Sequence, residues 1–270
     1  TLAPDIETYR DSLSQPLRFL GRGAQFYAFL TEDGRYVLKL FKHQHLNTAH
    51  PLDNIPLPPL QSYLEQRREE RERRRAKLFL SCKLAADELA EDTGVILAHL
   101  NRTDNVLNIQ TKFQDRFGAW HEISLDNLEF VLQHYSRPLP EAFSSLMKSG
   151  QLKEAQEMVE DLIAVVARRC DKGIRDTDQA FLDNYGFIAG HAIEFDVGSL
   201  NRYELIRERP YRDQEILLQL EPFHGWLLEN FPQLLPQLQE SLHRHLQAPT
   251  ALPIPPSESK QVWGGRTGAC

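Results

Sequence analysis

The sequence contains few of the residues that build covalent or metal-bound scaffolds. Its 270 residues include only three cysteines, Cys82, Cys170 and Cys270, spread over the whole chain. This excludes a disulfide framework and a cysteine-based zinc site, and it predicts a reducing, cytoplasmic compartment. No apolar run approaches the roughly 20 residues that span a bilayer, and no signal-peptide pattern is visible. The chain begins with Thr1, which leaves open a targeting or membrane segment further upstream.

An excess of positive charge is also lacking. The formal net charge is -7 at pH 7, although Arg and Lys are concentrated locally. This balance argues against a chain that wraps nucleic acid, so no nucleic-acid partner is expected. A chain of this length is expected to fold as one large domain or as two lobes.

The most unusual stretch is residues 173–198, which read GIRDTDQAFLDNYGFIAGHAIEFDVG. Carboxylates at this density repel one another unless a cation or a basic partner lies among them. The oxygen-rich set, with no Cys and one His, suits Mg²⁺ or Mn²⁺ better than zinc. The polar groups are Asp176, Asp178, Asp183, Asn184, Glu194 and Asp196.

The spacing within this stretch predicts a hairpin. Residues 185–188 and 191–195 read as two short strands around the turn Ala189-Gly190. Such a hairpin would bring Asn184 and Asp196 to the same end, where an amide oxygen and a carboxylate could share one metal ion.

Near the N-terminus, strand-like runs with glycine punctuation follow from Leu17 onward. A turn at Gly21-x-Gly23 between two strands could place backbone N–H groups against a polyphosphate, although a plain turn fits this motif equally well. Lys39 shares one strand face with Val37 and Phe41 by the period of two, so its ammonium lies beside apolar neighbours and requires an anion. The alternative is a lysine that only blocks an edge strand.

A long helix is predicted over residues 60–90, after two prolines. Its mixed Glu/Arg run is expected to be mainly a solvated face held by i,i+4 pairs. An inward stripe is expected through Ala76, Phe79, Leu80 and Leu84. Extending this stripe toward the helix start reaches Glu72, Glu69 and Glu65, of which we choose Glu69 as a partner of Lys39.

The order of these motifs resembles that of the protein-kinase-like superfamily, with Asp196-Val197-Gly198 in place of the usual D-F-G. The resemblance covers residues 17–198. It implies an α+β, two-lobed fold, with a small β-rich lobe that carries one long helix, a helical lobe, and a ligand in the cleft between them. We expect an N-terminal extension over residues 1–16, the β-rich lobe over 17–138, the helical lobe over 139–247, and a disordered tail over 248–270.

The resemblance also implies ATP with Mg²⁺ or Mn²⁺ as the ligand. Lys39 would bind the α- and β-phosphates, and Asn184 and Asp196 would hold the metal ion. Gln133 to Tyr135 would form the hinge that offers backbone groups to adenine, although an ordinary sheet strand fits these residues equally well.

Three alignments of the acidic loop remain open. In the preferred one Asp178 is the catalytic base, because it lies 18 residues before Asp196, the usual distance in the family, and Asp176 supports the loop. In the second, Ile174-Arg175-Asp176 matches the H-R-D motif, so that Asp176 is the catalytic base. In the third, Asp183 is the metal ligand and Asn184 supports it.

Several departures from the family pattern argue against a conventional protein kinase. Phe26 replaces the third glycine, the H-R-D histidine is absent, Ala180 stands where many kinases have a lysine, and no A-P-E follows Asp196. An atypical phosphotransferase for a small molecule, a lipid or a protein is predicted. The alternatives are a catalytically inactive pseudokinase that acts as a scaffold, and another nucleotidyl transfer such as AMPylation. Activity is favoured because a scaffold has no chemical need for Lys39, Asp178, Asn184 and Asp196 together.

Overall fold

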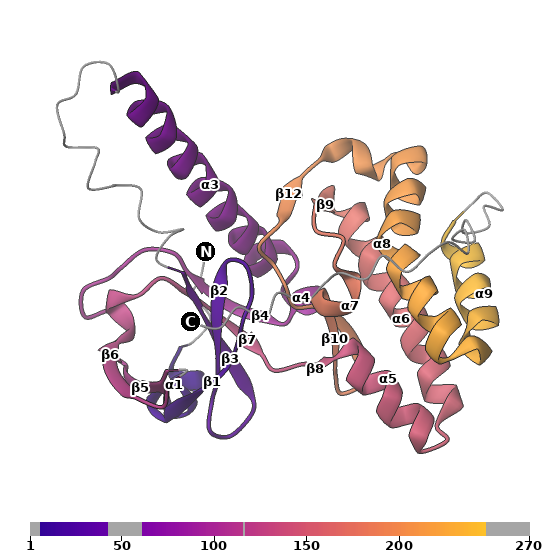
Figure 1. Cartoon of the computed structure of the whole chain (residues 1–270), viewed down its shortest axis with the longest axis horizontal. Helices are drawn as coiled ribbons and strands as arrows, with labels where there is room; N and C mark the ends of the chain where they lie inside the picture. The colour runs from indigo at the N-terminus through magenta and orange to yellow at the C-terminus, as the bar shows by residue number, and fades with distance from the viewer. Residues whose placement is uncertain (1–5, 43–60, 116, 247–270) are drawn as a thin grey trace, which may run out of the picture.

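The computed structural model describes residues 6–42, 61–115 and 117–246. These residues form a β-rich lobe and a helical lobe side by side (Figure 1). This confirms the predicted α+β class and is consistent with a two-lobed, kinase-like fold. The expected tail over 248–270 lies outside the described residues.

The β-rich lobe is built on one strongly curved sheet of seven strands in the order β4-β7-β3-β2-β1-β5-β6. All neighbours pair antiparallel except β1 and β5, which are parallel. A short helix, α1 (Glu7–Ser14), precedes the sheet. The strands are β1 (Pro16–Arg22), β2 (Phe26–Leu30), β3 (Tyr36–Phe41), β4 (Val95–His99), β5 (Gln110–Gln114), β6 (Trp120–Ser124) and β7 (Phe130–His134).

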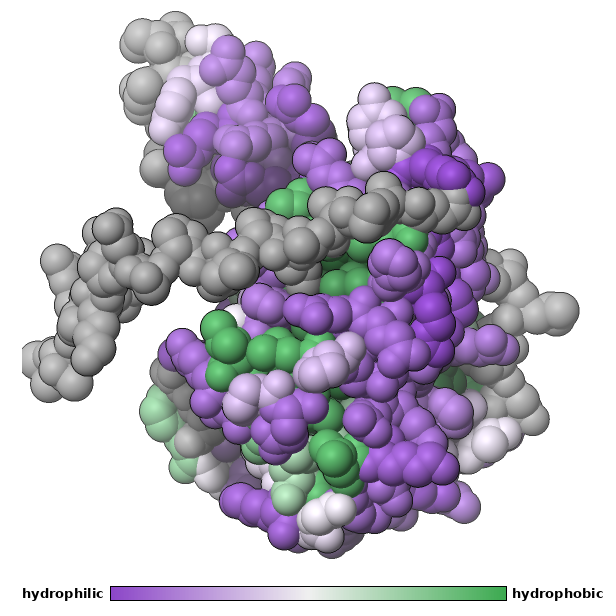
Figure 2. Space-filling view, turned by 90° about the vertical axis from the view of Figure 1, so that its right-hand side faces the viewer, coloured by the Kyte–Doolittle hydropathy of each residue, from purple (hydrophilic) through white to green (hydrophobic). Residues whose placement is uncertain are grey.

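The long helix α3 (Gln61–Glu88) has two different halves. Its first half projects from the body (Figure 1) and its surface is almost wholly hydrophilic (top of Figure 2), with i,i+4 pairs such as Arg68–Glu72 at 3.1 Å. Its second half buries Leu78, Cys82 and Ala85 in a core shared with the sheet. The short helix α4 (Ala90–Thr93) follows. Only the second half of α3 can therefore place side chains near the sheet.

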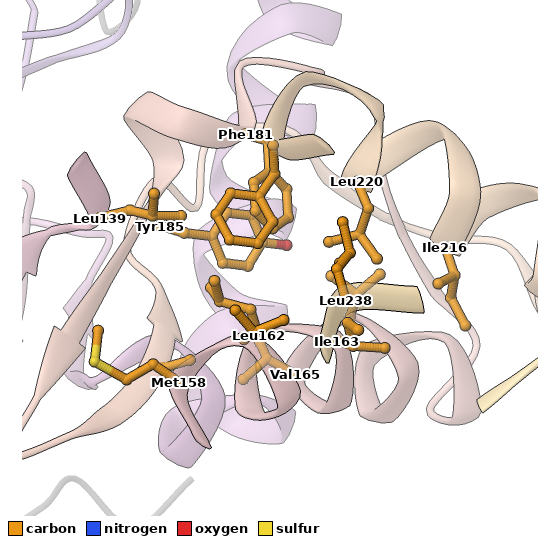
Figure 3. Packing of buried hydrophobic residues seen from close by; sticks show 14 of the residues in the cluster. Leu139, Met158, Leu162, Ile163, Val165, Phe181, Tyr185, Ile216, Leu220 and Leu238 are labelled. Carbon is orange, nitrogen blue, oxygen red and sulfur yellow. The ribbon is translucent and has the colours of Figure 1, made fainter. Parts of the chain in front are cut away.

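The helical lobe packs around α6 (Leu152–Asp171). Figure 3 shows Met158, Leu162 and Val165 of α6 facing the aromatic pair Phe181 and Tyr185, whose rings stack with their centroids 4.1 Å apart. Short strands lie between the helices and form two small sheets, β11-β10-β8 and β12-β9. The remaining elements are η3 (Leu125–Asn127), β8 (Arg137–Pro138), α5 (Leu139–Lys148), β9 (Ile174–Asp176), α7 (Phe181–Asn184), β10 (Tyr185–Ile188), β11 (His191–Glu194), β12 (Leu200–Arg202), η4 (Glu204–Arg207), α8 (Arg209–Asn230), η5 (Pro232–Leu234) and α9 (Leu235–His245).

The described parts of the chain contain no helix that is both long enough and apolar enough to cross a membrane. The two cysteines in these parts, Cys82 and Cys170, are buried and unpaired.

Candidate functional site

A cavity of about 590 Å³ opens between the two lobes. Its size is that of a site for a small organic ligand. It is lined by Leu20, Gly21, Arg22, Gly23, Phe26, Ala28, Val37, Lys39, Gln133, His134, Tyr135, Ser136, Pro138, Asp183, Asn184, Phe195 and Asp196. The fold therefore brings the glycine turn, the strand lysine, the end of β7 and the Asn–Asp pair to one cavity.

The glycine turn between β1 and β2 is short and fixed. The Gly23 amide donates to the Phe26 carbonyl at 3.1 Å, and the Lys42 amide donates to the Gln25 carbonyl at 2.9 Å. A Cβ added at Gly21 or Gly23 would meet no heavy atom within 4 Å. The space beside both glycines is therefore open, although the Gly23 amide is already used within the turn.

Lys39 is 8% exposed, in the middle of β3. Its Nζ donates a hydrogen bond of 2.5 Å to the Phe195 carbonyl and lies 5.5 Å from the centre of the Phe195 ring. Burial lowers the pKa of Lys39, while Asp196 and Cys82 act in the opposite direction. The fold has already removed this ammonium from water. Binding an anion at the cavity wall therefore costs it little further desolvation.

The predicted pairing of Lys39 with Glu69 is wrong. Glu69 is exposed on the projecting half of α3, and Cys82 is the α3 residue near Lys39. Thirteen residues separate Glu69 from Cys82, which is about 20 Å along a helix. The expected inward stripe is confirmed in part: Leu84 is buried in the core shared with the sheet and Phe79 packs against it, whereas Ala76 and Leu80 are exposed.

Asn184 and Asp196 meet at the end of the hairpin β10–β11, whose register pairs Tyr185 with Glu194. The Asn184 carbonyl accepts hydrogen bonds from the amides of Phe195 at 2.8 Å and Asp196 at 3.4 Å. The carboxylate of Asp196 accepts the amide of Gly198, at 3.3 Å. An amide oxygen and a carboxylate at one wall of the cavity could supply the protein ligands of a Mg²⁺ ion, since that ion usually takes its other ligands from water and substrate phosphates.

The described residues contain no group of three or more His, Cys, Asp or Glu side chains that could hold a metal ion without further ligands. The donor set at Asn184 and Asp196 therefore fits a metal ion that arrives with a phosphate ligand better than a permanently bound one.

The two aspartates of the catalytic-loop alignments lie in different environments, and neither lines the cavity. Asp176 is 2% exposed; its Oδ1 accepts the Asp178 amide at 2.9 Å and the Ser199 hydroxyl. Asp178 is half-buried, and its Oδ1 accepts the Ala180 amide at 2.9 Å. Asp183, the residue of the third alignment, does line the cavity.

Asp176 belongs to a buried charged cluster beneath this loop. Arg169 is fully buried, with its guanidinium 2.5 Å from Glu194, 3.3 Å from Glu215 and 3.7 Å from Asp176. Burial raises the pKa of Glu194 well above its usual range, although Arg169 acts against this. The sequence contained a signal for this cluster, because Arg169 continues the apolar stripe of α6 at helical spacing after Leu162.

At the end of β7 two backbone amides are already hydrogen-bonded to neighbouring segments. The Tyr135 amide donates to the Arg35 carbonyl at 2.8 Å, and the His134 amide donates to the Gly94 carbonyl at 2.9 Å. Within the described parts of the chain the Ser136 amide has no such partner, and Ser136 lines the cavity. The accessible donor thus lies one residue beyond the predicted segment.

Comparisons with known proteins add little to this geometry. No protein-family model matches the chain, and a search of curated proteins found no match. Solved structures with some similarity include WbdD, a bifunctional kinase-methyltransferase, with 15% identity and a TM-score of 0.38; the match covers 84% of this chain and 44% of WbdD. Another is the Rv3197–erythromycin complex from Mycobacterium tuberculosis, with 13% identity and a TM-score of 0.32 over 86% of this chain and 56% of the other. The chain thus spans about half the length of these proteins, and TM-scores below 0.5 support no functional conclusion.

Proposed function

We propose that the chain is an ATP- and Mg²⁺-dependent phosphotransferase of atypical kinase-like type. The observation that carries the proposal is the meeting of Lys39 from the β-rich lobe with Asn184 and Asp196 from the helical lobe at one cavity. A buried ammonium opposite two oxygen ligands complements a polyphosphate that carries a divalent cation.

Each side chain then has a specific task. Lys39 would turn from the Phe195 carbonyl to the α- and β-phosphates, and the open glycine turn at residues 21–23 would lie along them. Asn184 and Asp196 would hold Mg²⁺, which neutralises charge on the transferring phosphoryl group. The backbone around Ser136 would receive the adenine ring.

Asp178 remains our preferred catalytic base, because it is the more accessible carboxylate of the two in the loop and Asp176 is enclosed by Ser199 and Arg169. A base must reach the acceptor hydroxyl, so a carboxylate open to solvent suits this task better than a buried one.

The acceptor is proposed to be a small molecule, a lipid or an atypical protein substrate. Between Asp196 and α8, which begins at Arg209, the chain forms only β12 and η4. Strand β12 is paired with β9, so Leu200 faces Asp176 in the register. These few residues are already used to cover the loop, which leaves little chain for a platform that docks an extended peptide.

A pseudokinase is the second candidate, and a specific observation favours it. Lys39 is engaged with the protein itself, and Asp178 does not line the cavity. A cavity of this kind could bind a nucleotide and transmit its presence to a partner without transferring phosphate.

Thermal unfolding with and without ATP plus Mg²⁺ or Mn²⁺ tests binding. Ligand at about 100 times its Kd should stabilise the native state by roughly 2.7 kcal/mol. Asp196→Ala should remove the metal-dependent part of this shift, whereas Gln114→Leu, a change on β5 away from the cavity, should keep it. Phosphate release from ATP then separates the two candidates: an enzyme hydrolyses ATP slowly even without its acceptor, and a pseudokinase does not. The absence of any shift with the unaltered chain would refute the phosphotransferase and would leave only a scaffold that does not bind nucleotide.

A further inference from the structure

Lys39 is held in place although the acidic helix partner expected for it is missing. Among the described residues no carboxylate forms an ion pair with its Nζ, whose hydrogen bond goes to the Phe195 carbonyl. Cys82 of α3, which interacts electrostatically with Lys39, is fully buried, and burial raises the pKa of its thiol to about 12. At neutral pH that thiol is uncharged and cannot act as a counter-ion.

The Phe195 carbonyl also receives a second donor. Gln133, which is 1% exposed in β7, donates from Nε2 to the Phe195 carbonyl at 3.2 Å. The same nitrogen donates to the Thr93 carbonyl, at the end of α4, at 2.5 Å. Because an amide nitrogen carries two hydrogens, both contacts can exist together, and Gln133 links α4 to the strand that leads into the Asp-Val-Gly segment.

The Phe195 peptide controls where the metal-binding side chains lie. Its amide donates to the Asn184 carbonyl at 2.8 Å, and Asp196 is the next residue along the chain. Any shift of the Phe195 carbonyl would therefore move Asp196 relative to Asn184. A carbonyl oxygen has two acceptor sites, and here one is taken by Lys39 and the other by Gln133.

Nucleotide binding would disturb this arrangement unless a second donor remained. When Lys39 turns toward phosphate oxygens, the carbonyl of Phe195 loses its strongest partner. A partly buried carbonyl that loses its donors is unfavourable and would be expected to move. Gln133 keeps the carbonyl bonded, so Lys39 is released while Asp196 stays in position.

We propose that Gln133 is a positioning residue: through the Phe195 carbonyl it holds Lys39 and Asp196 where a phosphate–metal group meets them, in place of an acidic side chain on α3. This role rests on the proposed function. It differs from the adenine contact predicted for this segment, because the side chain of Gln133 is turned toward Phe195 and Thr93.

Two variants and two probes test the role. Gln133→Leu removes both donors, and Gln133→Glu keeps the shape but replaces the amide by a carboxylate, which cannot donate to carbonyls and attracts Lys39. Gln114→Leu, in β5 of the same sheet, is the matched control. The probes are Mg²⁺·ATP, which needs the phosphate and metal groups, and adenosine, which does not.

We expect both Gln133 variants to bind Mg²⁺·ATP about tenfold more weakly, the effect of one well-placed hydrogen bond. Adenosine affinity should change less than about twofold, because the backbone at Ser136 is untouched, and the control should bind both probes like the unaltered chain.

Equal weakening of adenosine and Mg²⁺·ATP would show a merely structural residue and overturn the proposal, as would unchanged binding of both probes. Gln133→Glu decides the matter if Gln133→Leu does not fold. Failure of the unaltered chain to bind either probe would be a different result, since it would refute the proposed function and with it this role.

Discussion

Replacement of Lys39 by methionine should separate the functional value of this ammonium from its cost to stability. Lys39→Met keeps the length and most of the volume of the side chain, and volume-conserving changes disturb a core little. The variant should lose Mg²⁺·ATP binding. Its folded state should nevertheless be at least as stable as that of the unaltered chain at neutral pH.

The magnitude follows from two opposing contributions. The substitution removes one hydrogen bond from a charged donor to the Phe195 carbonyl, worth about 1.5–3 kcal/mol. It also removes the desolvation penalty of a buried ammonium, which is several kcal/mol. The carbonyl keeps a donor in Gln133, so no orphaned group results. We therefore expect a free energy of unfolding between unchanged and about 2 kcal/mol higher.

The pH dependence gives an independent check. Burial lowers the pKa of Lys39 below its ordinary value of 10.5, so the unfolded chain binds this proton more tightly than the folded chain. The unfavourable contribution of Lys39 is complete below its folded pKa and disappears as pH rises toward 10.5, because stability increases with pH wherever the unfolded state holds more protons. The stability advantage of Lys39→Met should therefore shrink between neutral and alkaline pH.

Urea unfolding near neutral pH and near pH 10 measures both effects. Lys112→Met is the control, since Lys112 lies on β5 with 57% of its side chain exposed; its effect should stay within about 0.5 kcal/mol at both pH values. A loss of more than about 2 kcal/mol in Lys39→Met at neutral pH would contradict the reasoning, because Lys39 would then be a stabilising residue in its own right.

Three further outcomes are expected. Gly186→Ala should lower the free energy of unfolding by about 2 kcal/mol in urea titrations, because the new Cβ would lie 2.6 Å from the Arg137 carbonyl; an unchanged midpoint would mean that β8 can move aside. Asp126→Asn should cost a similar amount near pH 6, since this carboxylate accepts the amides of residues 106–108. Against the effect of burial, the Thr103 hydroxyl and then these amides lower the Asp126 pKa to about 2, so the advantage of the unaltered chain should be present above pH 3.8 and disappear as pH falls to about 2; a pH-independent difference would exclude this origin. Asp178→Asn should remove ATP turnover and keep nucleotide binding, whereas loss of turnover in Asp183→Asn alone would favour the third alignment.

The parts of the site that the sequence predicted depend on short-range geometry. The alternation of β3 placed Lys39 on a face with Val37, and the turn at Gly190 fixed the register that brings Asn184 near Asp196. A period of two or a tight turn constrains neighbours within a few residues, so these relations can be read from the chain itself.

The helix α3 shows where such reading failed. The run of Glu and Arg residues predicts a solvated helix, and the structure has one. Which residues of the helix contact the sheet is set by tertiary packing. Each helix residue adds about 1.5 Å along the axis, so a mistake of several positions in the contact point displaces it by many ångströms. The sequence therefore predicts Glu69 as the neighbour of Lys39, whereas in the structure Cys82 interacts with Lys39.

By itself the sequence determined the strand that carries Lys39 and the hairpin that ends at Asp196, because local periodicity and turn chemistry suffice for these features; the two-lobed α+β organisation was implied by the order of the motifs and their resemblance to the kinase-like superfamily. Only the tertiary structure decided which group holds the ammonium. Gln133 lies on β7 and Phe195 follows β11, 62 residues further along the chain, and hydrogen bonds between such distant groups depend on how the lobes pack rather than on any pattern within one segment.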